Sequence, residues 1–356
     1  MVEALPPGSV IGILGGGQLG RMLAVAASRL GLRCHIYDPA ATCPAGDIAH
    51  SITTGAWDET GALAAFAAAC DVVTFEFENV PAASLDAVEA NAPVFPPRGA
   101  LAVSQDRLSE KDLITGLGLK TADYAPVSTA SDLDDALTLI GTPSILKTRR
   151  LGYDGKGQAR LYTPSDKDAA FAAMAGADAI LEGFVDFKRE ISVIATRGRD
   201  HRIITFEPGE NVHRDGILHT TTVPAASDDT TRADAIAQTK TLMQTLDYVG
   251  TIGVEFFETD DGLVINEFAP RVHNSGHWTQ DGGVPCQFEA HIRAIAGWPL
   301  PDPVRSADVV MENLIGSDVD KAGTLAAEQG TALHLYGKAE TRPGRKMGHI
   351  NRVTPR

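Results

Sequence analysis

Two glutamates, Glu255 and Glu267, have the residue type and spacing that most directly suggest chemistry. They lie in apolar, strand-like segments on either side of Asp260-Asp261-Gly262. These three residues predict a hairpin loop with glycine in the left-handed position, which would pair Thr259 with Leu263. Counting back from that pair places Glu255 directly opposite Glu267, on one face of the hairpin.

Two neighbouring carboxylates repel each other unless a cation lies between them. A hard divalent cation with oxygen ligands resolves the conflict, and Mg²⁺ bound to substrate phosphates fits. Two alternatives remain open from the residues alone. Both glutamates could be solvated on an exposed face, or a register shifted by one residue could place them on opposite faces.

A basic, glycine-rich segment spans Lys147–Gly157, with the sequence KTRRLGYDGKG. It holds four cations and one acid, within a chain that is acidic overall. Its three glycines leave backbone N–H groups free to surround an anion, while lysine and arginine supply charge. It lacks the Gly-Lys-Ser/Thr ending of a P-loop. We interpret it as a polyphosphate site, with a solvated basic hairpin as the alternative.

A second glycine-rich turn, Gly15-x-Gly17-x-x-Gly20, lies between an apolar strand and a helix, and Asp38 ends the next strand. This is the dinucleotide fingerprint, which taken alone favours an NAD-dependent dehydrogenase. The turn could instead serve only close packing. It could also bind the phosphate of another ligand, and the adjacent Gln18 and Arg21 suit a phosphomonoester.

Three further groups of polar residues are weaker candidates. Glu182 and Glu190 bracket Gly183-Phe184-Val185, an arrangement that could meet an adenine edge and ribose hydroxyls or could simply be surface. A polar cluster follows Glu267 directly, and strand-end clusters are often functional. The last nineteen residues carry six cations and one acid, or +5, around the turn Pro343-Gly344. The members of the last two groups are Arg271, His273, Asn274 and His277, then Lys338, Arg342, Arg345, Lys346, Arg352 and Arg356.

Alternating strands and helices must position these residues. The first hundred residues predict strands at 10–14, 33–37, 72–75 and before Pro96-Pro97, with helices at 18–30, 59–69 and after Pro81. This order implies a parallel sheet covered on both faces. A helix over 106–117 and a small unit over about 124–182 follow. Beyond these we expect strands at 190–195, 202–206, 253–258 and 263–268, helices at 228–246 and 287–296, and a small β unit with a basic end.

Composition excludes several classes of protein. With 31 Lys and Arg against 46 Asp and Glu, the 356-residue chain has a formal charge of −15, which argues against nucleic-acid binding. No apolar run approaches the roughly 20 residues of a membrane span, and residues 1–9 do not resemble a secretory signal. The four cysteines are scattered, with no Cys-x-x-Cys pair, which indicates reduced thiols in the cytoplasm.

Together these segments resemble the ATP-grasp superfamily and, within it, the family of 5-(carboxyamino)imidazole ribonucleotide synthases. The resemblance covers residues 12–350. It is carried by GGGQLGRM at 15–22, TFEFENVP at 74–81, KTRRLGYDGKGQ at 147–158, INEFAPRVHNSGHWT at 265–279 and RPGRKMGH at 342–349.

The resemblance implies an ATP-grasp fold of mixed α/β and α+β class. An N-terminal Rossmann-like domain would span 1–98, an ATP-grasp domain 99–298 with a lid at about 124–186, and a small β-rich domain 299–356. It further implies a cytoplasmic ligase of purine biosynthesis, as a homodimer. ATP would phosphorylate bicarbonate, and the amine of aminoimidazole ribonucleotide would take up the CO₂ released from carboxyphosphate. The cofactors would be ATP and Mg²⁺, without NAD or biotin, and neither nucleic acid nor membrane would be a partner.

The resemblance also implies roles for individual residues. ATP contacts would be Arg107, Lys147, Glu182, Phe184, Val185, Glu190, His213 and Asn266, and the metal ligands Glu255 and Glu267. Ribonucleotide contacts would be Gln18, Leu19, Glu76, Lys338 and Arg345. Bicarbonate activation and carboxyl transfer would involve Tyr153, Asp154, Arg271 and His273. One departure is Ala269, at a position where many ATP-grasp enzymes carry asparagine as a further ligand.

Three alternatives compete with this prediction. One is another ATP-grasp ribonucleotide ligase, such as formate-dependent glycinamide ribonucleotide transformylase, against which the segments at 149–154 and 342–346 argue. The second is the dehydrogenase, and the third is a nucleotide-binding regulator without catalysis.

Overall fold

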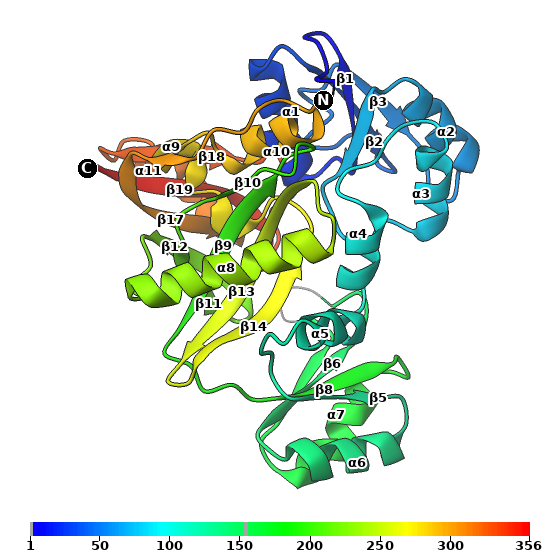
Figure 1. Ribbon diagram of the computed structural model, residues 1–356, viewed down its shortest axis with the longest axis vertical. Coiled ribbons are helices and arrows are strands. Elements are labelled where there is room, and N and C mark those ends of the chain that lie inside the picture. The colour runs from blue at the N-terminus through cyan, green and yellow to red at the C-terminus, as the bar shows by residue number, and fades with distance from the viewer. Residues whose placement is uncertain (1–2, 153–155) are drawn as a thin grey trace.

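The structure is a computed structural model that describes residues 3–152 and 156–356. An N-terminal unit and a small unit lie toward opposite ends of the long axis, with a large sheet between them (Figure 1). Within the described residues, no helix combines the length and apolar character that crossing a membrane requires.

A four-stranded parallel sheet, in the order β3-β2-β1-β4, forms the N-terminal unit. Ile11 and Ile13 pack on one side with α1, while Val73 and Phe75 pack on the other with α2 and α3. Both faces are therefore covered, as predicted. The elements are β1 (Val10–Leu14), α1 (Gln18–Arg29), β2 (Arg33–Asp38), β3 (Ser51–Thr54), α2 (Thr60–Ala68), β4 (Val72–Phe75) and α3 (Ala82–Glu89).

The prediction of a strand before Pro96-Pro97 is wrong. Only an isolated bridge between Val73 and Val94 forms there. Phe95 N donates to Val73 O and Val73 N donates to Pro93 O, so the next N–H groups on this edge would come from residues 93 and 97. Both are proline and have no backbone N–H, so the ladder does not extend. The short strand β3 was not predicted.

Two helices lead from this unit to the small one: α4 (Arg98–Ser104) and α5 (Arg107–Gly116). Asp106 caps α5, because its Oδ1 accepts a hydrogen bond from Leu108 N at 3.0 Å. The small unit is an antiparallel sheet in the order β5-β8-β6-β7 with its own core. Its elements are β5 (Tyr124–Val127), α6 (Ala130–Ile140), β6 (Ser144–Thr148), β7 (Gln158–Leu161), η1 (Pro164–Asp166), α7 (Lys167–Ala173) and β8 (Ala179–Gly183).

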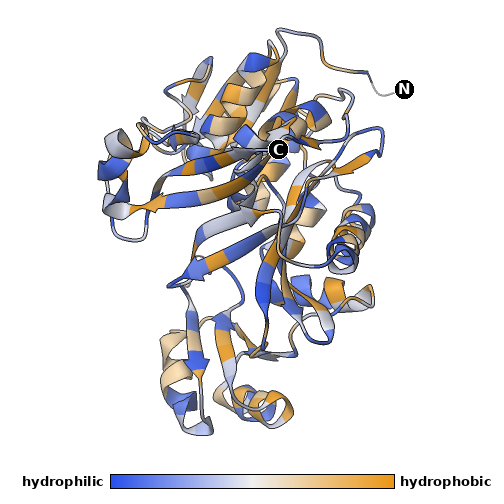
Figure 2. Ribbon diagram, turned by 90° about the vertical axis from the view of Figure 1, so that its left-hand side faces the viewer, coloured by the Kyte–Doolittle hydropathy of each residue, from blue (hydrophilic) through white to orange (hydrophobic). Residues whose placement is uncertain are grey.

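The large sheet has the order β14-β13-β9-β11-β12-β17-β19-β18, with β10 on β9. In the first half of β17 (Ala307–Ile315), buried Ala307, Val309 and Met311 alternate with exposed Asp308 and Val310. Hydrophobic and hydrophilic residues are intermixed along the strands of the molecule (Figure 2). Its first part holds β9 (Arg189–Arg197), β10 (Ile203–Thr205), β11 (Gly209–Arg214), β12 (Ile217–Val223), α8 (Asp229–Thr245), β13 (Gly250–Thr259) and β14 (Gly262–Ala269).

The C-terminal residues form strands, and these strands continue the large sheet. β12 pairs with β17 from Thr220↔Glu312 to Val223↔Val309. The elements here are η2 (Asn274–Gly276), α9 (Thr279–Gly282), β15 (Gly283–Val284), α10 (Gln287–Ile295), β16 (Val304–Arg305), β17 (Ala307–Ile315), η3 (Gly316–Lys321), α11 (Ala322–Leu325), β18 (Thr331–Leu335) and β19 (Lys346–Pro355).

Candidate active site

A cavity of about 740 Å³ opens where the N-terminal unit, the basic loop, β13–β14 and the C-terminal turn meet. Many of the predicted site residues line it together, although they are far apart in the sequence. These are Gln18, Leu19, Glu76, Arg107, His213, Glu255, Glu267, Arg271, His273, Lys338 and Arg345.

Six other predicted residues lie elsewhere. Lys147, Glu182, Phe184, Val185, Glu190 and Asn266 are not among the lining residues. Tyr153 and Asp154 fall outside the described residues, so their predicted role stays a prediction.

Glu255 and Glu267 face each other across β13 and β14, as predicted, but by a different route. The loop has two residues, so Thr259 pairs with Gly262 and the expected pairing of Thr259 with Leu263 is wrong. A bulge between Glu255 and Phe256 then inserts one extra residue, Asn266, into β14. The bulge restores the register that brings the two carboxylates together.

The two carboxylates differ in their electrostatic surroundings. Arg107 Nη1 donates to Glu267 Oε2 at 2.9 Å. Burial would raise the pKa of Glu267, but the charge of Arg107 lowers it to about 2. For Glu255, burial and the charge of Glu267 raise the pKa to about 7.

This pair fits a divalent cation. Glu267 has its own arginine, whereas the ionised form of Glu255 would be a buried negative charge that a bound cation would stabilise. Within the described residues, no group of three or more His, Cys, Asp and Glu is arranged to hold a metal. A cation here would therefore need oxygens from a ligand or water besides the two glutamates.

Helix α5 holds the bulged part of β14 through side chains that the sequence did not identify. Lys111 Nζ donates to the carbonyl of Asn266 at 2.7 Å, and Glu110 Oε1 accepts from Phe268 N at 2.7 Å. Together with the hydrogen bond from Arg107 to Glu267, three side chains of one helix contact three successive residues of the strand. The spacing i, i+3, i+4 places them on one helix face.

Glu182, from β8, is buried among cations. Lys147 Nζ lies 2.8 Å from its Oε2, and Lys111 Nζ 3.7 Å away. Burial would raise the pKa of Glu182, but Lys147 and Lys111 lower it to about 2. Its Oε1 is buried and has no hydrogen-bond partner within the described residues, so one acceptor remains available to a ligand.

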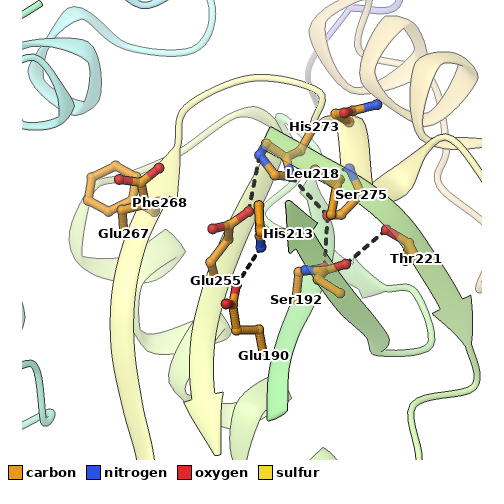
Figure 3. A network of polar contacts seen from close by, with 12 residues as sticks. Glu190, Ser192, His213, Leu218, Thr221, Glu255, Glu267, Phe268, His273 and Ser275 are labelled. Atoms are coloured by element: carbon orange, nitrogen blue, oxygen red, sulfur yellow. Dashed lines mark hydrogen bonds and ion pairs between the residues drawn. The ribbon is translucent and has the colours of Figure 1, made fainter. Parts of the chain in front are cut away.

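Glu190 of β9 and His213 of β11 form a pair beside Glu255 (Figure 3). Glu190 Oε2 lies 2.6 Å from His213 Nδ1. Burial alone would lower the pKa of His213, but Glu190 and Glu255 raise it above its ordinary value. These two carboxylates therefore favour the protonated form of His213, which would place positive charge close to the carboxylate pair.

Two predicted catalytic residues follow β14. Arg271 Nη2 lies 2.6 Å from Glu78 Oε1, and both residues line the cavity. His273 Nε2 lies 3.6 Å from Glu255 Oε1. An added side chain at Gly253 would come within 2.5 Å of His273 Cβ, so glycine there makes room for the histidine.

The Gly15–Gly20 turn already holds anions of the protein itself. Glu76 accepts hydrogen bonds from the backbone N–H groups of Gly17 and Gly20, the latter at 2.7 Å. Asp38 Oδ2 accepts from Gly16 N at 2.7 Å. A pyrophosphate could bind these amides only by displacing both carboxylates, which weighs against the dehydrogenase alternative and against a phosphate on this helix end.

The C-terminal turn brings cations to the cavity. Lys338, Arg345 and Lys346 line the cavity, and the charge of Lys346 reaches Glu255 and His213. The basic loop contributes Arg149, which makes two hydrogen bonds to Asp106 at 3.0 and 2.8 Å. Lys346 was predicted to be part of the basic end of the chain, but it was not predicted to be a site residue.

Comparison with known proteins agrees with this arrangement. Three family models match: "Ribonucleotide synthetase preATP-grasp domain" at residues 9–105, "ATP-grasp domain" at 112–288, and "Phosphoribosylaminoimidazole carboxylase C-terminal domain" at 309–356. N5-carboxyaminoimidazole ribonucleotide synthase of Brucella melitensis is 52% identical, over 99% of this chain and 98% of that protein.

Solved structures give the same result. An ADP complex of an N5-carboxyaminoimidazole ribonucleotide synthetase has a TM-score of 0.96 at 41% identity, covering 99% of this chain and 94% of that one. The enzyme of Aspergillus clavatus, in complex with ADP and 5-aminoimidazole ribonucleotide, has a TM-score of 0.92 at 30% identity, covering 98% and 94%.

Proposed function

The chain belongs to the N5-carboxyaminoimidazole ribonucleotide synthase family of ATP-grasp ligases, and we propose that it carboxylates 5-aminoimidazole ribonucleotide in purine biosynthesis. The substrates are ATP, bicarbonate and the ribonucleotide, and the products are the N5-carbamate, ADP and phosphate. The observation that carries this function is the facing pair Glu255 and Glu267, in one cavity with cations from three distant segments.

The proposed reaction has three steps. A bicarbonate oxygen attacks the γ-phosphorus of ATP, which gives carboxyphosphate and ADP. Carboxyphosphate then loses inorganic phosphate and leaves CO₂. The exocyclic amine of the ribonucleotide attacks the CO₂ carbon, and the nitrogen loses a proton. Because carboxyphosphate is short-lived in water, the site must exclude solvent while these steps occur.

We assign the nucleotide to the region between the small unit and the large sheet. In this assignment, Arg107 and Lys147 contact the phosphates of ATP. The adenine contacts Glu182, Phe184 and Val185. Glu190 binds the ribose, and His213 and Asn266 are further contacts of the nucleotide. Lys147 is already paired with Glu182, so phosphate binding would have to share its charge. Mg²⁺ held by Glu255 and Glu267 would neutralise phosphate charge during transfer.

We assign the ribonucleotide to the part of the cavity lined by Gln18, Leu19, Glu76, Lys338 and Arg345. Cationic Lys338 and Arg345 suit its phosphate, because the amides of the glycine-rich turn are occupied by Glu76. Arg271 suits the anionic oxygens of bicarbonate. His273, Tyr153 and Asp154 complete the proposed site of carboxyl transfer.

We further propose the domain limits 1–98, 99–298 and 299–356, with 124–186 as the lid. The homodimer and the cytoplasmic location expected from the family are part of the same proposal.

Measurement of ADP release with each component omitted in turn tests this function. We expect turnover only when ATP, Mg²⁺, bicarbonate and 5-aminoimidazole ribonucleotide are all present. Replacement of bicarbonate by formate, or ADP release that is indifferent to the ribonucleotide, would overturn the assignment.

A further inference from the structure

A short chain of hydroxyl groups ends on the imidazole of His273 (Figure 3). Ser192 of β9 donates from Oγ to Ser275 Oγ at 2.7 Å, and Ser275 Oγ lies 2.8 Å from His273 Nδ1. Both serines are buried, with 2% and 1% of their surface exposed. Bulk water therefore cannot satisfy these groups, and each donor needs an acceptor inside the protein.

The directions of these hydrogen bonds identify which ring nitrogen of His273 carries a proton. Ser275 Oγ accepts from Ser192, which leaves its own proton available for Nδ1. The backbone N–H of Ser275, which can only donate, lies 3.4 Å from the same nitrogen. A proton on Nδ1 would face the backbone N–H and would leave the buried hydroxyl proton of Ser275 without this acceptor. Nδ1 is therefore an acceptor, and the proton of the neutral ring is on Nε2.

The surroundings of His273 disfavour the charged form of the ring. Burial, together with the positive charges of Arg271 and Lys346, lowers the pKa of His273 well below its ordinary value. The ring lies against Gly253, where an added Cβ would come within 2.8 Å of its Cγ.

We propose that Ser192 and Ser275 are positioning residues that hold His273 as the Nε2–H tautomer, so that it presents a hydrogen-bond donor to the cavity. Nε2 lies 3.6 Å from Glu255 Oε1, beyond hydrogen-bonding distance, and His273 lines the cavity. The proton can therefore be donated to an anionic ligand oxygen. In this tautomer Nε2 cannot accept a proton, so His273 is not the base that takes the proton from the amine.

The identity of the ligand oxygen, an oxygen of bicarbonate or of the carboxylated intermediate, rests on the proposed function. The tautomer does not. It can be measured on the full chain without substrates, so failure of one inference is distinguishable from failure of the other.

Nitrogen-15 NMR of the protein labelled at histidine tests the tautomer, with the signal assigned by its loss in His273→Asn. We expect an unprotonated Nδ1 and a protonated Nε2 in the wild type. In Ser275→Ala, only the long contact from the backbone N–H remains, so a population with the proton on Nδ1 should appear. A proton on Nδ1 in the wild type would overturn the proposal.

Kinetics give a second readout. Ser275→Ala should lower kcat about tenfold, the effect of one misplaced hydrogen bond, with KM for ATP unchanged. Thr196→Val is the matched control, because it removes another buried hydroxyl of β9, one that lies 2.7 Å from Thr251 Oγ1. It should leave both the tautomer and kcat as in the wild type.

If Ser275→Ala does not fold, Ser192→Ala supplies the same measurement, because Ser275 Oγ then loses the donor that fixes its direction. A tautomer population unchanged in every serine variant that folds would overturn the proposal. An equal fall in kcat in Thr196→Val would do so as well, since that fall would reflect only the loss of a buried hydroxyl.

Discussion

Single charged residues in and beside the cavity are largely neutralised by one another before a ligand enters. Glu182 pairs with Lys147, Glu267 with Arg107, and Arg271 with Glu78. Glu255 differs, because its pKa is raised to about 7 by burial and by Glu267. A cation at the pair would therefore favour the ionised form of Glu255 most, and its binding should release protons near neutral pH.

Glu267→Gln tests the metal role of the pair. The variant keeps the size of the side chain but removes its charge, so metal-dependent turnover should fall at least ~100-fold, or ~2.7 kcal/mol of transition-state stabilisation. ADP release at saturating Mg²⁺ measures this. Glu312→Gln is the matched control, because it removes a strand glutamate paired with Arg352 at 2.6 Å outside the site. Activity that survives in Glu267→Gln would remove the metal role.

Glu110 should make stability depend on pH. Burial and the charge of Glu267 raise its pKa to about 8. The folded protein then binds a proton that the unfolded chain releases above its ordinary pKa, so the stabilisation is complete below about 4.5 and is lost as pH rises through 8.

The variant Glu110→Gln mimics the protonated form and can still accept from Phe268 N. The free energy of unfolding of the wild type, minus that of the variant, should therefore fall between pH 5 and 8, by at most about 1.4 kcal/mol per pH unit. Urea denaturation at several pH values measures the difference. A constant difference across this range contradicts the shift.

Residue type and order revealed much of this site, but not the residues that are buried by tertiary contact. Glu255, Glu267 and the basic loop stood out because their charges interrupt apolar or glycine-rich segments. Glu110 and Lys111 did not, since charged residues on a helix ordinarily face water. Only the packing of α5 against β14 shows that both are buried, with 3% and 1% of their surface exposed.

At the scale of elements, the hairpin β13–β14 shows how a correct prediction can rest on an incorrect step. The loop is one residue shorter than the sequence indicated, and the bulge at Asn266 compensates. Alternation of residues along a strand carries no signal for such a bulge. The carbonyl of Asn266 and the amide of Phe268 are bound by Lys111 and Glu110, so the contact that stabilises the bulge comes from an element 155 residues away.

The junction between α5 and the basic loop leads to a prediction about loop position. Asp106 caps α5 and also binds Arg149, while Arg107 N donates to the carbonyl of Arg149 at 3.0 Å. In Asp106→Asn the cap acceptor remains but the charge is lost. The loop should then detach more often, and tryptic cleavage at Arg149 and Arg150 should become about tenfold faster.

Asp132→Asn is the control for this prediction, because Asp132 is a capping aspartate of α6 that has no part in the junction. Timed proteolysis followed by mass spectrometry identifies the cut. Equal cleavage rates in Asp106→Asn and the wild type would show that the ion pair does not hold the loop.

At the scale of the whole molecule, the three regions are joined in unequal ways. The N-terminal unit shares a hydrophobic core with Phe288 and Ile292 of α10 and with Val272, which follows β14. Trp298 Nε1 adds a hydrogen bond to the carbonyl of Leu5 at 2.7 Å. The hydrophobic cluster of the small unit, by contrast, contains only its own residues, from Ala125 to Leu181. Its described contacts with the rest are mainly polar, such as Lys111 with Glu182.

This difference predicts how the molecule opens. Polar contacts exchange readily for contacts with water, whereas a shared apolar core must be exposed to separate. The strands β5–β8 should therefore open together, at a free energy at least ~2 kcal/mol below that of β1 and β9. Native-state hydrogen exchange followed by mass spectrometry measures both.

Addition of Mg²⁺ and ADP should protect β6 and β8 most, because a nucleotide bound at Lys147 and Glu182 links the small unit to the large sheet. This extra protection should be absent from Glu267→Gln if the metal connects the nucleotide to β14. Exchange of β5–β8 at the same free energy as β1, with or without nucleotide, would instead show one cooperative unit. The small unit could not then act as a lid by moving as a separate body.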